Sequence, residues 1–288
     1  MHKYKPQPKL RWHSHDIKYH DIDAEKVKSD FILCFALILS SFAESRDYPY
    51  PVPEPCIDST LRYIEDVWEP EEVQHGVALR KCVEHIFPKI EWEYHCKEYM
   101  KVFMHEAFPT FDLKPDPLHY GLKKAFEEIC TSTIYTTMYN AAKRFGDPTL
   151  QKVLLELKYD ECGHYVAFEK MFKEEQSKAP VGLIHRTRFL FKRIAGIRNS
   201  DFALLFPVVK RILITYNLFD KKEIYDKYGL HIDTMSYDQF YKHYNKWLKQ
   251  NYPYEMAIHM FSRLLFPNSK RMQKIFKPIG MTMLKVWT

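Results

Sequence analysis

Two segments of the chain repeat one short pattern inside apolar stripes of helical period. The sequence Glu-Glu-Val-Gln-His ends at His75, and Asp-Glu-Cys-Gly-His ends at His164, so acid-Glu-x-x-His occurs twice. A spacing of three places Glu72 with His75, and Glu161 with His164, on one face of a helix. The positions three or four residues before and after each pair are mainly apolar, and such a face is expected to point into a protein core.

Burying a carboxylate in such a core destabilises the folded state by about 3–5 kcal/mol, unless the carboxylate is paired or bound to metal. Glu44 and Glu128 occupy equivalent apolar seams on the helices expected to precede each copy of the pattern. Four Glu and two His are the ligand set of a carboxylate-bridged di-iron or di-manganese site in a four-helix bundle. The predicted metal ligands are therefore Glu44, Glu72, His75, Glu128, Glu161 and His164.

Helical periodicity runs through nearly the whole chain, and no convincing alternation of apolar and polar residues predicts a strand. A Pro-rich stretch at 48–59, the segment 109–117 and Gly146-Asp147-Pro148 break the pattern. We expect an all-α, ferritin-like four-helix bundle with one longer crossover, extra helices and a helical C-terminal extension. The expected helices of the bundle span 24–46, 59–86, 118–145 and 149–176, with a further helix at 90–106 and shorter ones at 201–218, 235–250 and 254–265.

The charge distribution divides the chain into unequal parts. Residues 185–288 hold 19 Lys and Arg against 7 Asp and Glu, whereas residues 1–184 hold 24 against 30. The predicted organisation is an N-terminal arm at 1–23, the bundle at 24–178 and a basic extension at 179–288 packed on the bundle. The basic extension could attract an acidic protein, a phosphate-bearing ligand or an anionic membrane, or it could be a solvated face without a dedicated partner.

Several classes of protein lose support from what the sequence lacks. It contains no glycine-rich phosphate loop, no G-x-S-x-G and no C-x-x-C, and its longest apolar runs are too short to cross a bilayer. The first residues are basic but carry no apolar stretch typical of a secretory signal, and the six Cys are scattered. We therefore expect a cytoplasmic protein without a transmembrane segment and without a nucleic-acid partner.

The same residues carry a resemblance to a known family. Trp68-Glu69-Pro70-Glu71-Glu72-Val73-Gln74-His75-Gly76 resembles the W-x-x-E-E-x-x-H-G segment of the soluble acyl-acyl-carrier-protein desaturases. Phe126-Glu127-Glu128-Ile129-Cys130-Thr131 is similar to their F-x-E-x-x-T. Gly146-Asp147 and the Asp160-Glu161-x-x-His164 that follows match in residue type and spacing. The similarity covers about residues 30–175, and its ligand motifs are typical of di-iron carboxylate proteins in general.

The resemblance implies a homodimeric, ferritin-like enzyme that binds two iron ions, with manganese as a possible substitute. Such an enzyme takes electrons from a ferredoxin, binds O₂ and removes two hydrogens from an acyl chain held on acyl carrier protein. The six residues named above would be the ligands, with Glu72 and Glu128 bridging the two ions. Thr131 matches the threonine beside the oxygen-binding face, where its hydroxyl would relay a proton; alternatively, it bonds back to a helix carbonyl.

Two further residues are candidates for supporting roles. A ligating imidazole usually donates its other N–H to a carboxylate, so Asp160 is expected to orient His75 across the bundle, with Glu71 in the same role for His164. Both acids could instead be solvated helix charges. Trp68 falls on an apolar seam, where it either fills the core or transfers electrons.

Departures from the family pattern leave alternatives open. Pro70 should start or kink a helix directly before Glu72, and residues 134–139 replace a polar stretch on the family's substrate side. A di-iron hydroxylase or N-oxygenase acting on another small or carrier-tethered substrate is the main alternative. Radical generation, as in ribonucleotide reductase small subunits, would require a Tyr where this chain has Leu79. Iron storage or a metal-stabilised scaffold gives the basic extension no role.

Overall fold

The computed structural model describes residues 10–45, 58–106, 117–197 and 201–287, and this part of the chain is helical without any strand. The all-α prediction is therefore confirmed. Parts of the predicted breaks at 48–59 and 109–117 lie outside the described residues. The α-helices are α1 (Ala24–Lys28), α2 (Phe31–Ala43), α3 (Asp58–Tyr63), α4 (Glu69–Ile86), α5 (Trp92–Glu106), α6 (Pro117–Phe145), α7 (Pro148–Lys178), α8 (Leu183–Ile197), α9 (Asp201–Thr215), α10 (Lys221–Tyr228), α11 (Tyr237–Asn251), α12 (Tyr254–Leu265) and α13 (Lys270–Trp287).

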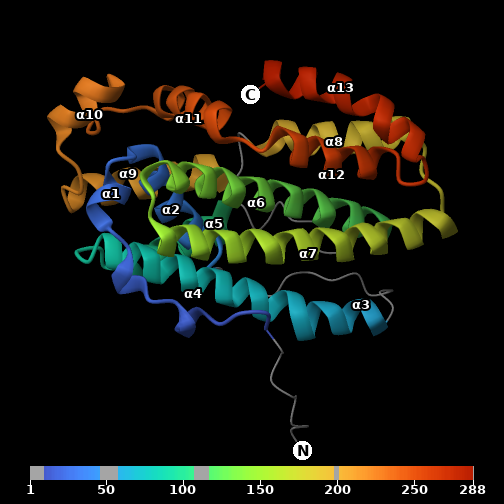
Figure 1. Ribbon diagram of the computed structural model, residues 1–288, viewed down its shortest axis with the longest axis horizontal. Coiled ribbons are helices and arrows are strands. Elements are labelled where there is room, and N and C mark those ends of the chain that lie inside the picture. The colour runs from blue at the N-terminus through green and yellow to red at the C-terminus, as the bar shows by residue number, and fades with distance from the viewer. Residues whose placement is uncertain (1–9, 46–57, 107–116, 198–200, 288) are drawn as a thin grey trace, which may run out of the picture.

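Helices α2, α4, α6 and α7 pack together as a bundle, with the two long helices α6 and α7 running antiparallel side by side (Figure 1). The turn between α6 and α7 needs a left-handed residue, which Gly146 supplies at φ 74°. Asp147 then caps α7, because its Oδ1 accepts from the backbone N–H of Leu150 at 2.7 Å. Its other oxygen, Oδ2, accepts from the backbone N–H of Asp23 at 2.7 Å, which ties the N-terminal segment to this turn.

The predicted helix at 24–46 is wrong as one element, because it is broken at Ser29 and Asp30. The side chain of Asp30 accepts from the backbone N–H of Leu33 and starts α2 as its N-cap. Helix α2 is buried on nearly all sides, since α4 and α6 cover one side of it and α9 and α11 the other. This position explains why its sequence is apolar all round rather than on one stripe.

The predicted helix at 59–86 is also divided. A π-helical turn spans Ile64–Trp68 between α3 and α4, and the N–H of Glu69 donates to the carbonyl of Ile64. Pro70 follows at the start of α4, where its missing N–H removes the bond to the residue four positions earlier. The wider turn before Pro70 accommodates this missing bond, and α4 then carries the first Glu-x-x-His pair.

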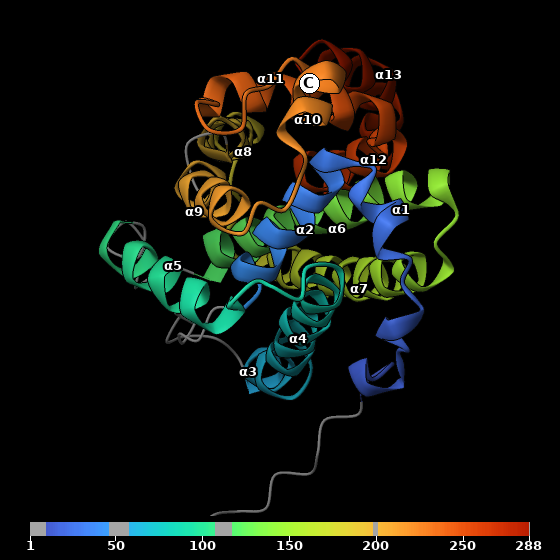
Figure 2. The ribbon, with the colours of Figure 1, turned by 90° about the vertical axis from the view of Figure 1, so that its left-hand side faces the viewer.

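The C-terminal helices form a layer on the α2 and α6 side of the bundle, away from α4 (Figures 1 and 2). Helices α9 and α11 pack on α2, and α12 packs on α6 between α8 and α13. Aromatic rings join the layers; the ring centroids of Phe35 and Phe240, for example, lie 4.0 Å apart. The sequence did not predict α8, α10 or α13. Among the described residues no helix combines the length and the apolarity that a membrane span requires.

Candidate metal centre

Each of the four bundle helices brings one part of a buried cluster of acidic and His side chains. Glu44 is the residue that ends α2, Glu72 and His75 lie on α4, Glu128 lies on α6, and Glu161 and His164 lie on α7. Their donor atoms form two groups, within each of which all atoms lie within 4.8 Å of one another. One group is Glu72, Glu128, Glu161 and His164, and the other is Glu44, Glu72 and His75.

The structure thus brings the six predicted ligands together at one place. Glu161 and His75 are fully enclosed, His164 and Glu128 are nearly so, and Glu44 and Glu72 are partly exposed. Glu72 belongs to both groups, whereas Glu128 belongs to the first. A cluster of this composition and burial could hold a metal ion, because carboxylate oxygens and imidazole nitrogens are the usual ligands of iron, manganese and zinc.

The two His side chains have matching outer partners. His75 Nε2 lies 3.2 Å from Asp160 Oδ2, and His164 Nε2 lies 2.8 Å from Glu71 Oε2. Each contact crosses between α4 and α7, so the helix that supplies one His supplies the carboxylate for the other. A carboxylate at Nε2 accepts the ring N–H and leaves the Nδ1 lone pair for the inside of the cluster.

The imidazole and carboxylate atoms that point into the cluster are unusual because they lack hydrogen bonds to any residue that the structure describes. His75 Nδ1, His164 Nδ1 and Glu161 Oε1 are buried and take part in no hydrogen bond among the described residues. His75 Nδ1 approaches Glu161 Oε1 to 3.2 Å, and His164 Nδ1 approaches Glu72 Oε1 to 3.2 Å. Buried polar atoms without hydrogen bonds destabilise a fold by about 1–3 kcal/mol each, and a metal ion held by the cluster would provide a partner for these three atoms.

Electrostatics around the cluster favour protonated ligands while no metal is bound. Burial, with Glu72 and Glu161 nearby, raises the pKa of Glu44 to about 8. Burial also raises the pKa of Glu128 well above its usual value, and the Glu161 charge adds to this effect. For His75, burial alone would lower the pKa, but Asp160 and Glu161 raise it to about 10. Glu161 itself keeps a low pKa despite its burial, because His164 and His75 face it.

Metal binding should therefore release protons near neutral pH. Glu44 and His75 hold protons below about pH 8 and pH 10, and a metal ligand must be deprotonated. We expect the apparent affinity for Mn²⁺ to rise as the pH is raised from 7 to 9. Calorimetric titration in two buffers of different ionisation enthalpy would measure the protons released. An affinity that does not change with pH, with no proton release, would contradict this expectation.

The outer carboxylates allow a symmetric test. Replacing Asp160 by Asn, or Glu71 by Gln, removes the charge that holds one imidazole and is expected to weaken metal binding about 10-fold to 100-fold. Competition between the protein and a chelator for Mn²⁺ measures the affinity. Glu174→Gln is the matched control, because Glu174 is a partly exposed acid on the same helix and contacts Lys170 rather than a His or Arg11. If both substitutions bind metal as tightly as the control, the outer contacts do not position the His side chains.

Thr131 lies beside the cluster on α6. Its Oγ1 is 2.8 Å from Glu161 Oε2, and 3.3 and 3.4 Å from the carbonyl oxygens of Glu127 and Glu128. A hydroxyl has one hydrogen to donate, and the shortest distance assigns it to Glu161. Thr131 therefore contacts a predicted ligand directly, in addition to the weaker contacts to its own helix.

Tyr135, one turn further along α6, donates its hydroxyl hydrogen to Glu44 Oε1 at 2.6 Å. The side chain is almost completely buried, and its ring lies next to that of His75. The sequence placed Tyr135 on the same seam as Glu128 and Thr131, but the resemblance assigned it no role. Its spacing of seven residues from Glu128 is the signal that identifies it, because seven residues complete two helical turns.

Removing the Tyr135 hydroxyl isolates its effect on Glu44. Tyr135→Phe is expected to weaken binding of one of two metal ions roughly tenfold, since Glu44 loses the donor that holds its carboxylate in place. A stepwise Mn²⁺ titration followed by electron paramagnetic resonance would resolve the weaker ion. Tyr139→Phe is the control, one turn further along the same helix. If the two variants bind Mn²⁺ with equal affinity, the Tyr135 hydroxyl does not position the carboxylate of Glu44.

Sequence reasoning missed the contribution of the N-terminal segment. The indole N–H of Trp12 donates to Asp160 Oδ2 at 2.6 Å, and Arg11 Nε donates to Asp160 Oδ1 at 2.8 Å. Asp160 therefore joins His75 to two residues from the region predicted to be an arm. No local pattern could have found this contact, because about 150 residues separate the partners.

Trp68 lies away from the inner cluster. It is buried among apolar residues including Ile64 and Phe168, its ring centroid is 6.5 Å from that of His164, and the Lys124 ammonium lies 4.5 Å from its ring. These neighbours are those of a core residue.

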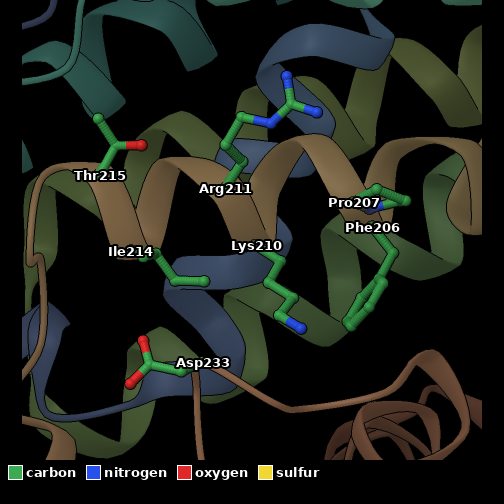
Figure 3. A pocket seen from close by; sticks show the side chains of 7 residues that line it. All are labelled: Phe206, Pro207, Lys210, Arg211, Ile214, Thr215 and Asp233. Carbon is green, nitrogen blue, oxygen red and sulfur yellow. The ribbon is translucent and has the colours of Figure 1, made fainter.

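Two surface hollows lie apart from the cluster. One, of about 440 Å³, runs along α9 toward Asp233. Figure 3 shows Phe206, Lys210 and Ile214 on the side that faces Asp233, with Arg211 pointing away. Lys210 donates to the carbonyl of Met235 and Asp233 pairs with Lys221, so their polar groups already have partners. The other hollow, of about 570 Å³, lies between Thr136 on α6 and residues 252–256, and no predicted ligand lines either hollow.

Comparison with known proteins adds no family to these observations. No model of a known protein family matches the chain, and a search of curated proteins finds no match.

Proposed function

We propose that this chain is an O₂-dependent oxidoreductase that binds two iron ions in the cluster and oxidises an unactivated C–H bond. The observation that carries the proposal is the geometry of the two His side chains. Each has its Nε2 against a carboxylate of the opposite helix and its buried Nδ1 toward the shared Glu residues, without a hydrogen bond. That arrangement suits a pair of cations between α2, α4, α6 and α7.

The chain's own residues prepare the site for this chemistry. When bound, a carboxylate-held iron pair supplies the redox equivalents that reduce O₂ and oxidise a C–H bond. Asp160 and Glu71 hold the His rings in the tautomer that presents Nδ1. Tyr135 holds the carboxylate of Glu44, and the surrounding apolar side chains exclude bulk water. Thr131 Oγ1 lies 2.8 Å from Glu161 Oε2 and donates its hydroxyl hydrogen to it, so this hydroxyl can pass a proton.

The favoured substrate is an acyl chain on acyl carrier protein, from which two hydrogens are removed. This choice rests on the resemblance to the soluble desaturases and on the basic C-terminal layer. Helix α11 exposes Lys242, Lys246 and Lys249, which an acidic carrier protein would recognise through its charge. The same resemblance supports a ferredoxin-like electron donor and a homodimer. The alternative is hydroxylation or N-oxygenation of another carrier-tethered or free small molecule.

An unbiased product search tests the proposal. Iron-loaded protein is incubated with ferredoxin, its reductase, NADPH and O₂, together with acyl carrier proteins bearing chains of different length or with amine substrates. The expected product is an acyl chain lighter by two hydrogens, detected by mass spectrometry. A product heavier by one oxygen would support the hydroxylase or N-oxygenase instead. If iron binds and O₂ is consumed but no substrate changes, the proposed C–H oxidation is wrong.

The three lysines of α11 provide a second test of the carrier. A Lys242→Glu, Lys246→Glu and Lys249→Glu variant is expected to lose affinity for the carrier at least tenfold while keeping its metal. Lys152→Glu, Lys170→Glu and Lys178→Glu, at exposed positions of α7, together form the charge-matched control. Unchanged carrier binding by the α11 variant would show that the carrier docks elsewhere.

A further inference from the structure

The structure gives helix α13 an apolar surface that its neighbours cover only in part. Phe276 and Gly280 face α12, and a Cβ on Gly280 would lie 2.2 Å from Ile258 Cδ1, so the two helices are in close contact. Met272, Ile275 and Ile279 follow one another at spacings of three and four on a neighbouring stripe and are exposed, Ile279 by 54%. Helix α13 therefore presents a fixed row of large aliphatic side chains to solvent.

Helix α8 presents a similar row. Ile184 is 77% exposed and Phe191, two turns further on, is 45% exposed, with Leu183 beside them. Arg186 of α8 donates to the carbonyl of Leu265 at the end of α12, and Phe266 packs against Phe276 of α13. The N-terminal parts of α8 and α13 thus both contact the C-terminal end of α12. The exposed apolar side chains of both helices lie in the C-terminal layer, and Arg188 lies between Ile184 and Phe191 on the stripe of α8.

Positive charges flank both rows. Arg188 and Lys192 are exposed on α8, and Lys270, Arg271 and Lys274 are exposed on α13. No ion pair with a carboxylate is found for these five residues within the described part of the chain. The sequence has no Asp or Glu at all between 176 and 200 or between 256 and 288. Large exposed apolar side chains together with unpaired cations are typical of a helix that lies on an anionic membrane surface.

We propose that this face, formed by the exposed residues of α8 and α13, binds the surface of a bilayer that contains anionic lipids. The aliphatic side chains enter the region between headgroups and acyl chains, and the Arg and Lys side chains contact lipid phosphates. A second copy of the chain is a poor occupant, because it would bring the same cations face to face. An acidic carrier protein is better matched by α11, whose exposed lysines lack large exposed aliphatic neighbours.

Co-sedimentation with vesicles tests this proposal on the full chain, with and without metal. We expect binding to vesicles of phosphatidylcholine mixed with phosphatidylserine, little binding to phosphatidylcholine alone, and weaker binding as salt is raised. Ile275→Ser with Ile279→Ser should lower the partition coefficient on the order of tenfold. Arg271→Gln with Lys274→Gln should lower it by a similar factor and reduce its salt dependence.

Val73→Ser with Val166→Ser is the matched control, because both side chains are exposed aliphatic groups on α4 and α7, outside the proposed face. Circular dichroism establishes that each variant keeps its helices. The proposal is overturned if the wild type binds neither vesicle, if the isoleucine variant binds like the control, or if the isoleucine variant instead loses binding to acyl carrier protein. Because vesicle binding is also measured without metal, a failure to bind vesicles can be distinguished from a failure of the proposed oxidation.

Discussion

Replacing Glu161 and His164 together by alanine is expected to remove at least one of the two bound ions, whereas the unaltered chain retains both. Glu161 approaches both His side chains, and His164 Nδ1 faces Glu72 and Glu128 as well. The pair therefore supplies two of the four residues of one donor group and contacts the His of the other. Glu161 and His164 face each other, so the double substitution removes both members of this pair and does not leave one of them buried without the other. Elemental analysis of the purified variant after metal loading measures the result.

The control keeps the helix and changes only its surface. Lys170→Ala with Glu174→Ala removes an exposed pair from the same α7 helix, 3.9 Å apart and away from the cluster. This variant should retain the metal content of the wild type. If the Glu161 and His164 variant also retains full metal, the assignment of the ligands is wrong.

A large gain in thermal stability on metal binding is the second expected result. Each site that is saturated at 100 times its dissociation constant stabilises the folded state by about 2.7 kcal/mol. Two such sites would raise the melting temperature by on the order of 10 °C in a chain of this size. The physical reason is that two cations neutralise a cluster of four carboxylates, in which burial raises the pKa of Glu44 and Glu128 while no metal is bound.

Scanning calorimetry with and without Mn²⁺ measures this shift, since Mn²⁺ avoids the reaction of Fe²⁺ with O₂. The Glu161→Ala and His164→Ala variant provides the reference and should show a clearly smaller shift, because it lacks two residues of one donor group. A shift of equal size in that variant would place the bound metal outside the cluster.

Much of the bundle is predictable because its long helices keep one apolar period. The predicted helix 118–145 differs from α6 by one residue, and 149–176 differs from α7 by three, since Gly146, Asp147 and Pro148 mark the turn between them. The convergence of the six candidate ligands follows from the same periodicity. A Glu or His that interrupts an apolar seam at the correct spacing must point inward with it.

The remaining features depend on contacts between distant residues or on local backbone competition. Asp30 directly precedes the apolar run that begins at Phe31, and helical period continues on both sides of it, so only its capping bond reveals the break. Trp12 lies 148 residues before Asp160 in the chain, and no local sequence pattern predicts a contact between residues that far apart. Helix α13 contains Pro278 and Gly280, residues that normally signal a helix break, so its range was not predicted from the pattern.

A crystal structure of the iron-loaded protein, with anomalous scattering recorded at the iron edge, tests the central claim most directly. The account predicts two anomalous peaks per chain between α2, α4, α6 and α7. One peak should be bound by Glu44, Glu72 and His75, and the other by Glu72, Glu128, Glu161 and His164. A single peak, peaks outside the bundle, or either His turned toward solvent would contradict it.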